Sequence, residues 1–285
     1  MPITFNALLR DAEIDPKGVR LVRHQDSRAD ADRTPYALWR DHSADFVTYQ
    51  SRQSPRSARS LSAPFWAVFV VTPGKETLFA GLYDVGEAQP GEIGLPAVHI
   101  RNAVEGEEYV AFDLALSERL GEYIGKLVID WGPGFLAWVQ QAEKQNKPVL
   151  ELRSKFQEPE FPGYLKFIKP LSEIEALPVA WKTALSAVKG VYVLTCPNTK
   201  LLYVGSATGQ GGFYERWVQH ARTGGDALQL RIREPSDYQV SILEVAASGA
   251  LPDDIVRLEH LWMRKLQTVE MGLNSGTTRP SPRTD

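Results

Sequence analysis

The sequence predicts an α+β protein in two parts: a mixed, strand-rich N-terminal part, and a C-terminal part with a small antiparallel sheet flanked by helices. Both parts contain alternating apolar residues on either side of short turns, a pattern typical of β-hairpins. Residues 213–221 and 253–266 carry apolar side chains at helical spacing. Between residues 155 and 178, four prolines and little periodicity mark the boundary between the parts.

The composition is that of an ordinary globular protein. Of 285 residues, 43% are hydrophobic and 24% are charged, which suffices for one large domain or two smaller ones. The single cysteine, Cys196, excludes an intramolecular disulfide and suits a reducing compartment. The first residues lack the pattern of a secretory signal, and no apolar run has the length of a membrane span. We therefore expect a soluble, cytoplasmic protein with no membrane association.

In the N-terminal part, the pattern predicts one short helix and two hairpins, with a loop-rich stretch of serines and arginines ending at Pro64. The helix is expected over residues 34–42, and the hairpins over residues 65–72 with 77–85 and 125–131 with 135–141. This part matches no family by its motifs. We assign residues 1–176 to a domain that recognises DNA or reads a modified base.

In the C-terminal part, a helix over residues 177–188 leads into a hairpin, and a third strand covers residues 238–245. The hairpin arms start at Gly190 and Leu201, with a turn around Cys196. Helices are expected over the two segments named above. The second domain is assigned to residues 177–276, and residues 277–285 are expected to be a disordered polar tail.

Six polar residues of the C-terminal part are candidates for chemistry. Tyr192 and Tyr203 each stand in a motif with a glycine, and two of the six share a helix face because they lie four residues apart. Each residue alone also has a purely structural explanation, as a strand tyrosine, a surface ion pair or a turn former. The six are Tyr192, Tyr203, Arg216, His220, Glu259 and Asn274.

The order and spacing of these residues resemble the GIY-YIG nuclease superfamily, over residues 190–276 only. Gly190-Val191-Tyr192 resembles the first motif and Tyr203-Val204-Gly205 the second, each with Val in place of Ile. The family's helix arginine falls on Arg216, its metal-binding glutamate on Glu259 and its late asparagine on Asn274. The position of His220, four residues after Arg216, resembles the arrangement in the restriction-endonuclease branch of the family.

The resemblance implies hydrolysis of a phosphodiester bond with one Mg²⁺ or Mn²⁺ per active site, bound by Glu259. Tyr192 is expected to act as the general base and Tyr203 as its partner or as a phosphate-positioning group. A tyrosine needs help to lose its proton, which His220 can accept, and Lys200 or Arg216 could stabilise the phenolate. Arg216 is expected to stabilise the phosphate, and Asn274 to make a main-chain or phosphate contact.

Double-stranded DNA is the expected partner, although the net charge of −3 argues against binding by bulk electrostatics. Two local arginine clusters are compatible with nucleic acid, and the one between residues 49 and 60 is equally compatible with a solvated loop. The candidate DNA-contacting residues are Lys200, Arg222, Arg231, Arg233, Arg52, Arg56 and Arg59. Cutting both strands needs two active sites or two visits, and a homodimer is one way to supply them.

The leading functional interpretation is a DNA endonuclease of restriction or phage defence, acting on ordinary or on modified DNA. One alternative is a repair or recombination nuclease for damaged or branched DNA. Another is a DNA-binding protein that keeps the fold without cleaving. The complete set of six residues disfavours the last alternative.

Overall fold

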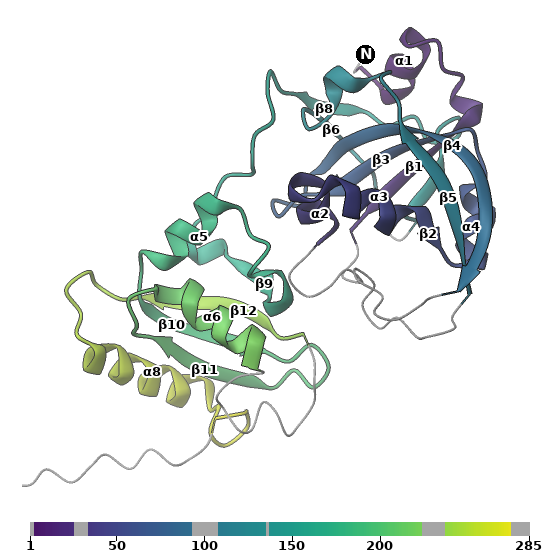
Figure 1. The fold of residues 1–285 in the computed structure, drawn as a ribbon. Helices are drawn as coiled ribbons and strands as arrows, with labels where there is room; N and C mark the ends of the chain where they lie inside the picture. The colour runs from purple at the N-terminus through teal and green to yellow at the C-terminus, as the bar shows by residue number, and fades with distance from the viewer. Residues whose placement is uncertain (1–2, 26–33, 93–107, 135–136, 224–236, 275–285) are drawn as a thin grey trace, which may run out of the picture. The chain divides into compact units, whose positions relative to one another are not determined.

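A computed structural model describes residues 3–25, 34–92, 108–134, 137–223 and 237–274 of the chain. The chain falls into two compact units, Met1–Pro159 and Glu160–Asp285. Each unit combines helices with a β-sheet (Figure 1), so the predicted α+β class is confirmed. None of the helices among these residues is long and apolar enough to cross a lipid bilayer.

The first unit contains a mixed sheet with the strand order β2-β5-β4-β3-β1-β7, in which β6 pairs with β4 and β8. The pairing of β1 with β3 is parallel, whereas the other pairings are antiparallel. Its strands are β1 (Val19–His24), β2 (Arg52–Gln53), β3 (Phe65–Val71), β4 (Thr77–Glu92), β5 (Glu108–Leu116), β6 (Leu127–Ile129), β7 (Val139–Gln141) and β8 (Val149–Leu152). Its helices are α1 (Phe5–Asp11), α2 (Pro35–Asp41), α3 (Ser43–Ser51) and α4 (Pro55–Leu61), with 3₁₀ turns at Pro16–Gly18 and Gly121–Tyr123.

Strand β3 is covered on both faces, which explains its continuous apolar sequence. Trp66 and Val68 belong to the core that includes residues of α2, α3 and α4. Ala67 and Phe69 point the other way, into the core that includes Phe5 of α1. The predicted helix over residues 34–42 and the β3–β4 hairpin are confirmed. Two tryptophans of this unit, Trp66 and Trp131, are core residues.

Two expectations for the first unit are wrong. The serine and arginine stretch is not loop-rich, because Ser54 caps α4 by accepting a hydrogen bond from the backbone N of Ser57 at 3.2 Å. Residues 125–131 and 135–141 do not pair as a hairpin. Both edges of β6 are already occupied by β4 and β8, so β7 pairs with β1 instead. Residues 135 and 136 lie outside the described residues.

The second unit contains an antiparallel sheet with the strand order β11-β10-β12-β9. The predicted hairpin, third strand and three helices of this unit are confirmed. The strands are β9 (Ile168–Pro170), β10 (Gly190–Thr195), β11 (Leu202–Ala207) and β12 (Gln239–Val245). The helices are α5 (Val179–Ser186), α6 (Gly212–Thr223) and α8 (Pro252–Leu266), with 3₁₀ turns at Tyr164–Lys166 and Leu171–Glu173.

The helices of the second unit lie on opposite faces of its sheet, with α5 and α6 on one face and α8 on the other (Figure 1). Alternation along β10 decides what each face receives. Tyr192 and Leu194 join the core under α5 and α6, whereas Val191 packs with Val204 and Ile255 under α8. Tyr192, a candidate site residue, is therefore held between well-packed layers.

The division between the units falls after Pro159, not between residues 176 and 177. The cause is that residues of the proline-rich segment are part of the second unit's fold. β9 pairs with β12, and the ring of Phe167 stacks on Trp217 with centroids 5.3 Å apart. Ile174 is fully buried in the same core.

Candidate active site

Tyr192 lies within β10 and is fully buried. Its ring packs edge-on against Phe213 and Trp217 of α6. Its hydroxyl is hydrogen-bonded to Nε2 of His220, a buried residue of the same helix. The phenol and the imidazole thus form a pair that joins the sheet to α6.

Two glycines make room for this arrangement. Gly205 stands opposite Tyr192 in the β10–β11 ladder, and a Cβ at Gly205 would lie 2.5 Å from the hydroxyl oxygen of Tyr192. A Cβ at Gly190 would lie 2.1 Å from the carbonyl oxygen of Glu244 in β12. The glycine of each motif therefore has a steric reason: one leaves space for the tyrosine ring, and the other lets β12 pair with β10.

Helix α6 supplies two of the candidate residues. It begins at Gly212, whose φ of +56° and close approach to the carbonyl oxygen of Val188 require a residue without a Cβ. Arg216 and His220 then share the helix face predicted from their spacing. The guanidinium of Arg216 donates a hydrogen bond from Nη1 to Oε1 of Gln219, at 2.8 Å.

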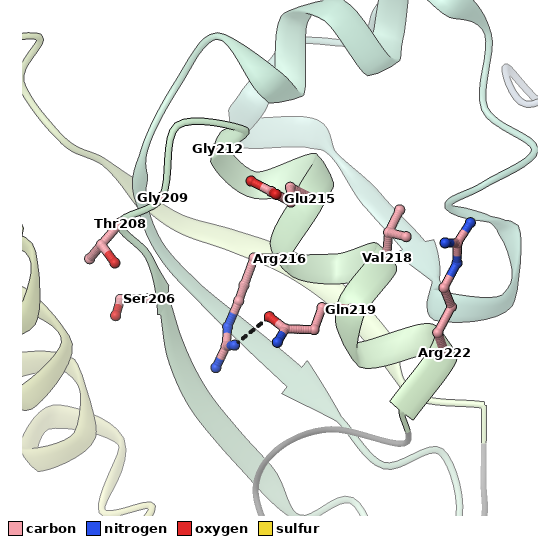
Figure 2. A pocket seen from close by; sticks show the side chains of 9 residues that line it. All are labelled: Ser206, Thr208, Gly209, Gly212, Glu215, Arg216, Val218, Gln219 and Arg222. Carbon is pink, nitrogen blue, oxygen red and sulfur yellow. Dashed lines mark hydrogen bonds between the residues drawn. The ribbon is translucent and has the colours of Figure 1, made fainter.

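An open cleft of about 720 Å³ lies against α6 (Figure 2). Arg216 and Gln219 project from α6, and Ser206 of β11 lies across from them. Glu215 also lines the cleft, and its Oε2 accepts a hydrogen bond from the backbone N of Gly211 at 3.1 Å. The lining residues are Ser206, Thr208, Gly209, Gly212, Glu215, Arg216, Val218, Gln219 and Arg222.

Glu259 comes from α8, on the other face of the sheet. Its carboxylate is half-buried, and its Oε2 accepts a hydrogen bond from the hydroxyl of Ser206 at 2.6 Å. Burial raises the pKa of Glu259, and the hydroxyl of Ser206 and the charges of His260 and Arg216 act in the opposite direction. The carboxylate therefore interacts electrostatically with Arg216, which lines the cleft.

The charges of the site also converge on Tyr192. Burial raises the pKa of Tyr192 above its ordinary value, and Tyr203 and Glu259 raise it further, while Arg216 lowers it by charge and by hydrogen bonding. Tyr203 lies edge-on to His220, with ring centroids 6.1 Å apart. The structure thus brings together five of the six residues predicted from the sequence.

Asn274, the sixth residue, makes a main-chain contact with β11. Its Oδ1 accepts a hydrogen bond from the backbone N of Val204 at 2.9 Å, and its Nδ2 donates one to the carbonyl oxygen of Val204 at 2.8 Å. Both ends of the amide are used in this way. Asn274 therefore fixes the strand segment between Tyr203 and Gly205.

The basic residues predicted to contact DNA have different surroundings. The ammonium of Lys200 is hydrogen-bonded to the carbonyl oxygen of Pro197 in the hairpin turn. The guanidinium of Arg222 makes two hydrogen bonds with the carboxylate of Glu175, at 2.9 and 2.6 Å. Of the two groups expected to stabilise a phenolate, Arg216 is the one whose charge and hydrogen bond lower the pKa of Tyr192.

The three candidate arginines of the first unit lie on β2 and α4. Arg52 has its guanidinium over the ring of Tyr109, 5.5 Å from the centroid, and Arg56 and Arg59 are exposed on α4. Two further candidates, Arg231 and Arg233, lie outside the described residues. The structure therefore leaves the DNA-contacting roles of these arginines as predictions.

Sequence reasoning missed four polar residues of the cleft: Ser206, Thr208, Gln219 and Glu215. Ser206 follows Val204 by two positions on β11, so both face α8, and Gln219 lies three residues after Arg216 on α6. These spacings were available in the sequence. They became meaningful only when the partners across the cleft were known.

Glu259 supplies one carboxylate of a kind that suits a hard divalent cation. Within the described ranges, no group of three or more histidine, cysteine, aspartate or glutamate side chains could hold a metal ion. Glu259 offers a half-buried carboxylate beside a serine hydroxyl. Mg²⁺ and Mn²⁺ accept one carboxylate and complete their coordination with waters and phosphate oxygens.

Comparison with known proteins gives two similar solved structures. The chain is 23% identical to the catalytic domain of the homing endonuclease I-TevI, over 30% of this chain and 97% of that chain, with a TM-score of 0.27. It is 22% identical to a mutant of the same domain, over 32% of this chain and 97% of that chain, also with a TM-score of 0.27. No protein-family model and no curated protein matches the sequence. At these values the two likenesses say nothing about this chain's activity.

Proposed function

We propose that the chain is a metal-dependent endonuclease that hydrolyses phosphodiester bonds in double-stranded DNA. The observation that carries the proposal is the hydrogen bond between Tyr192 and His220 beside the guanidinium of Arg216. A phenol that passes its proton to an imidazole can take a proton from water. A fixed guanidinium can bind a phosphate. Phosphodiester hydrolysis needs both capabilities.

The proton path runs through Tyr192. His220 Nε2 accepts the hydroxyl proton of Tyr192 while the phenolic oxygen takes a proton from the attacking water. Because burial raises the pKa of Tyr192, the phenol does not ionise by itself near neutral pH and depends on His220. We assign Tyr203 to positioning the phosphate or the Tyr192 side chain.

Arg216 and Glu259 are the residues we assign to stabilising the negative charge that develops on the phosphate during hydrolysis. Arg216 is a planar cation in the cleft that matches the non-bridging oxygens of the phosphate and stabilises the charge that grows there. Glu259 would hold one Mg²⁺ or Mn²⁺, an ion that supplies further charge stabilisation and assists departure of the 3′ oxygen when bound. Asn274 keeps the strand that carries Tyr203 in register.

The biological role we propose is restriction of foreign DNA such as phage DNA. It is supported by the position of His220, four residues after Arg216, as in the restriction branch of the family that the motifs resemble. The first unit would recognise the DNA, by sequence or by a modified base, with Arg52, Arg56 and Arg59 on phosphates. A homodimer would bring the two active sites needed to cut both strands.

The test is cleavage by the full chain of unmodified, methylated and branched DNA in Mg²⁺. We expect cleavage of at least one linear duplex, abolished by EDTA and by Tyr192→Phe. The matched control is Tyr238→Phe, which removes another buried hydroxyl of this unit and should leave cleavage intact. Cleavage of branched DNA alone would identify a repair or recombination nuclease. Binding of every duplex without cleavage in Mg²⁺ or Mn²⁺ would refute the nuclease assignment.

A further inference from the structure

Ser206 is the residue through which the sheet contacts the Glu259 carboxylate. It lies on β11 two positions after Val204, so both side chains point toward α8. On α8, Glu259 follows Ile255 by one helical turn and occupies the same face. The hydroxyl of Ser206 consequently meets Oε2 of Glu259, at 2.6 Å.

The strand that carries Ser206 is held firmly. Ser206 pairs with Val191 in the β10–β11 ladder. Two residues earlier on the same strand, the backbone N and carbonyl oxygen of Val204 are both hydrogen-bonded to the side-chain amide of Asn274. The same strand also carries Tyr203. Through Ser206, the position of β11 therefore determines where the carboxylate of Glu259 on α8 is held.

Glu259 has few other means of orientation. Its neighbours on α8, Leu258 and Trp262, pack against the sheet with apolar atoms, which position the helix without directing a carboxylate. Among the described residues, Glu259 forms no ion pair, and its one hydrogen bond engages Oε2. A glutamate side chain has several rotatable bonds, so fixing the carboxylate requires a specific contact.

We propose that Ser206 is a positioning residue that orients the Glu259 carboxylate for binding a divalent cation. The hydrogen bond occupies Oε2 and leaves Oε1 for the cation. This inference rests on the proposed function, because it assumes that Glu259 is the metal-binding residue. Ser206 itself need not touch the substrate.

The test is the affinity of the full chain for Mn²⁺, measured by electron paramagnetic resonance titration with and without a short DNA duplex. We expect Ser206→Ala to weaken Mn²⁺ binding by roughly 10- to 100-fold, the usual range for residues that orient a metal ligand. Ser206→Thr keeps the hydroxyl and should restore binding to within about threefold. Ser241→Ala on β12 is the matched control for losing a strand hydroxyl.

Cleavage kinetics provide a second readout. For Ser206→Ala, the Mn²⁺ concentration needed for half-maximal cleavage should rise by the same factor as the dissociation constant, while the rate at saturating Mn²⁺ largely recovers. Thermal unfolding in EDTA verifies that the variants are folded.

Glu259→Gln separates the two proposals. If Glu259→Gln abolishes Mn²⁺ binding and Ser206→Ala binds like wild type, the positioning role is overturned and the metal assignment stands. If Glu259→Gln binds Mn²⁺ like wild type, the metal assignment and the positioning role both fall.

Discussion

The hydroxyl oxygen of Tyr192 lies where a side chain at position 205 would begin: a Cβ on Gly205 would stand 2.5 Å from that oxygen and 2.6 Å from Cζ. The backbone of Gly205 has no left-handed φ, so the requirement for glycine is one of space. The glycine of the second motif is thus explained by the tyrosine of the first. Their separation in sequence conceals a direct contact across the hairpin.

Gly205→Ala should therefore displace the Tyr192 ring from His220. We expect a loss of cleavage of at least about 100-fold, equivalent to ~2.7 kcal/mol of transition-state stabilisation. The comparison is Gly249→Ala, because a Cβ at Gly249 meets no atom within 4 Å. Cleavage rates of both variants on the same duplex decide the matter, and wild-type cleavage by Gly205→Ala would show that Tyr192 need not be where it lies.

His220→Ala should be inactive, and alkaline buffer should not restore it. For a phenol with the ordinary pKa of 10.0, the ionised fraction below pH 10 would rise about tenfold for each unit by which the pH rises. The phenolate formed in this way could replace the lost imidazole. Burial raises the pKa of Tyr192, so the neutral phenol persists between pH 7 and 9. We expect a loss of roughly 10²- to 10⁴-fold at both pH values. Recovery that grows tenfold per pH unit would contradict the raised pKa.

A fragment of residues 160–285 should fold, whereas a fragment of residues 177–285 should not. The shorter fragment lacks β9, which pairs with β12, and lacks Phe167 and Ile174 from the core. Without Phe167, the stacked face of Trp217 would be exposed. Circular dichroism during heating should show a cooperative transition for the longer fragment alone. The same transition in both would mean that the proline-rich segment is dispensable for folding.

The strands and helices that carry the site could be predicted because their signals are local. Alternation around the Cys196 turn predicted β10 and β11, and apolar spacing predicted α6 and α8. By contrast, β9 is three residues long and ends in Pro170, so it is too short to show the alternation that predicts a strand. It forms because β12 pairs with it and because Phe167, the residue before it, stacks on Trp217. The contact between Ser206 and Glu259 was equally invisible, since it depends on how α8 lies against the sheet.

The free energies of unfolding of wild type and Tyr83→Phe should become more similar at high pH. Burial raises the pKa of Tyr83 from 10.0 to about 12. A raised folded pKa contributes stability that is fully present below pH 10 and is lost as the pH rises toward 12, because the unfolded chain releases the proton first. Wild type should lose about 1.4 kcal/mol per pH unit through Tyr83 in this window, and the variant should not. Urea unfolding at pH 8, 10 and 11 measures the difference. A constant difference at all three pH values would refute the raised pKa.

Glu259→Gln and Arg216→Ala should both abolish cleavage, for different reasons. The glutamine removes the charge that would hold the divalent ion, while the phosphate-binding cations stay, so DNA affinity should be equal or slightly higher. The alanine removes a cation from the cleft, which should weaken DNA binding and cost roughly 10²- to 10³-fold in rate. Raising Mg²⁺ should not rescue Arg216→Ala, because the missing charge is the protein's own. Gel-shift affinities and cleavage rates in Mg²⁺, Mn²⁺ and Ca²⁺ distinguish the two variants. Near wild-type cleavage by Glu259→Gln in Mg²⁺ would place the metal at another residue and would remove the basis for the proposed site.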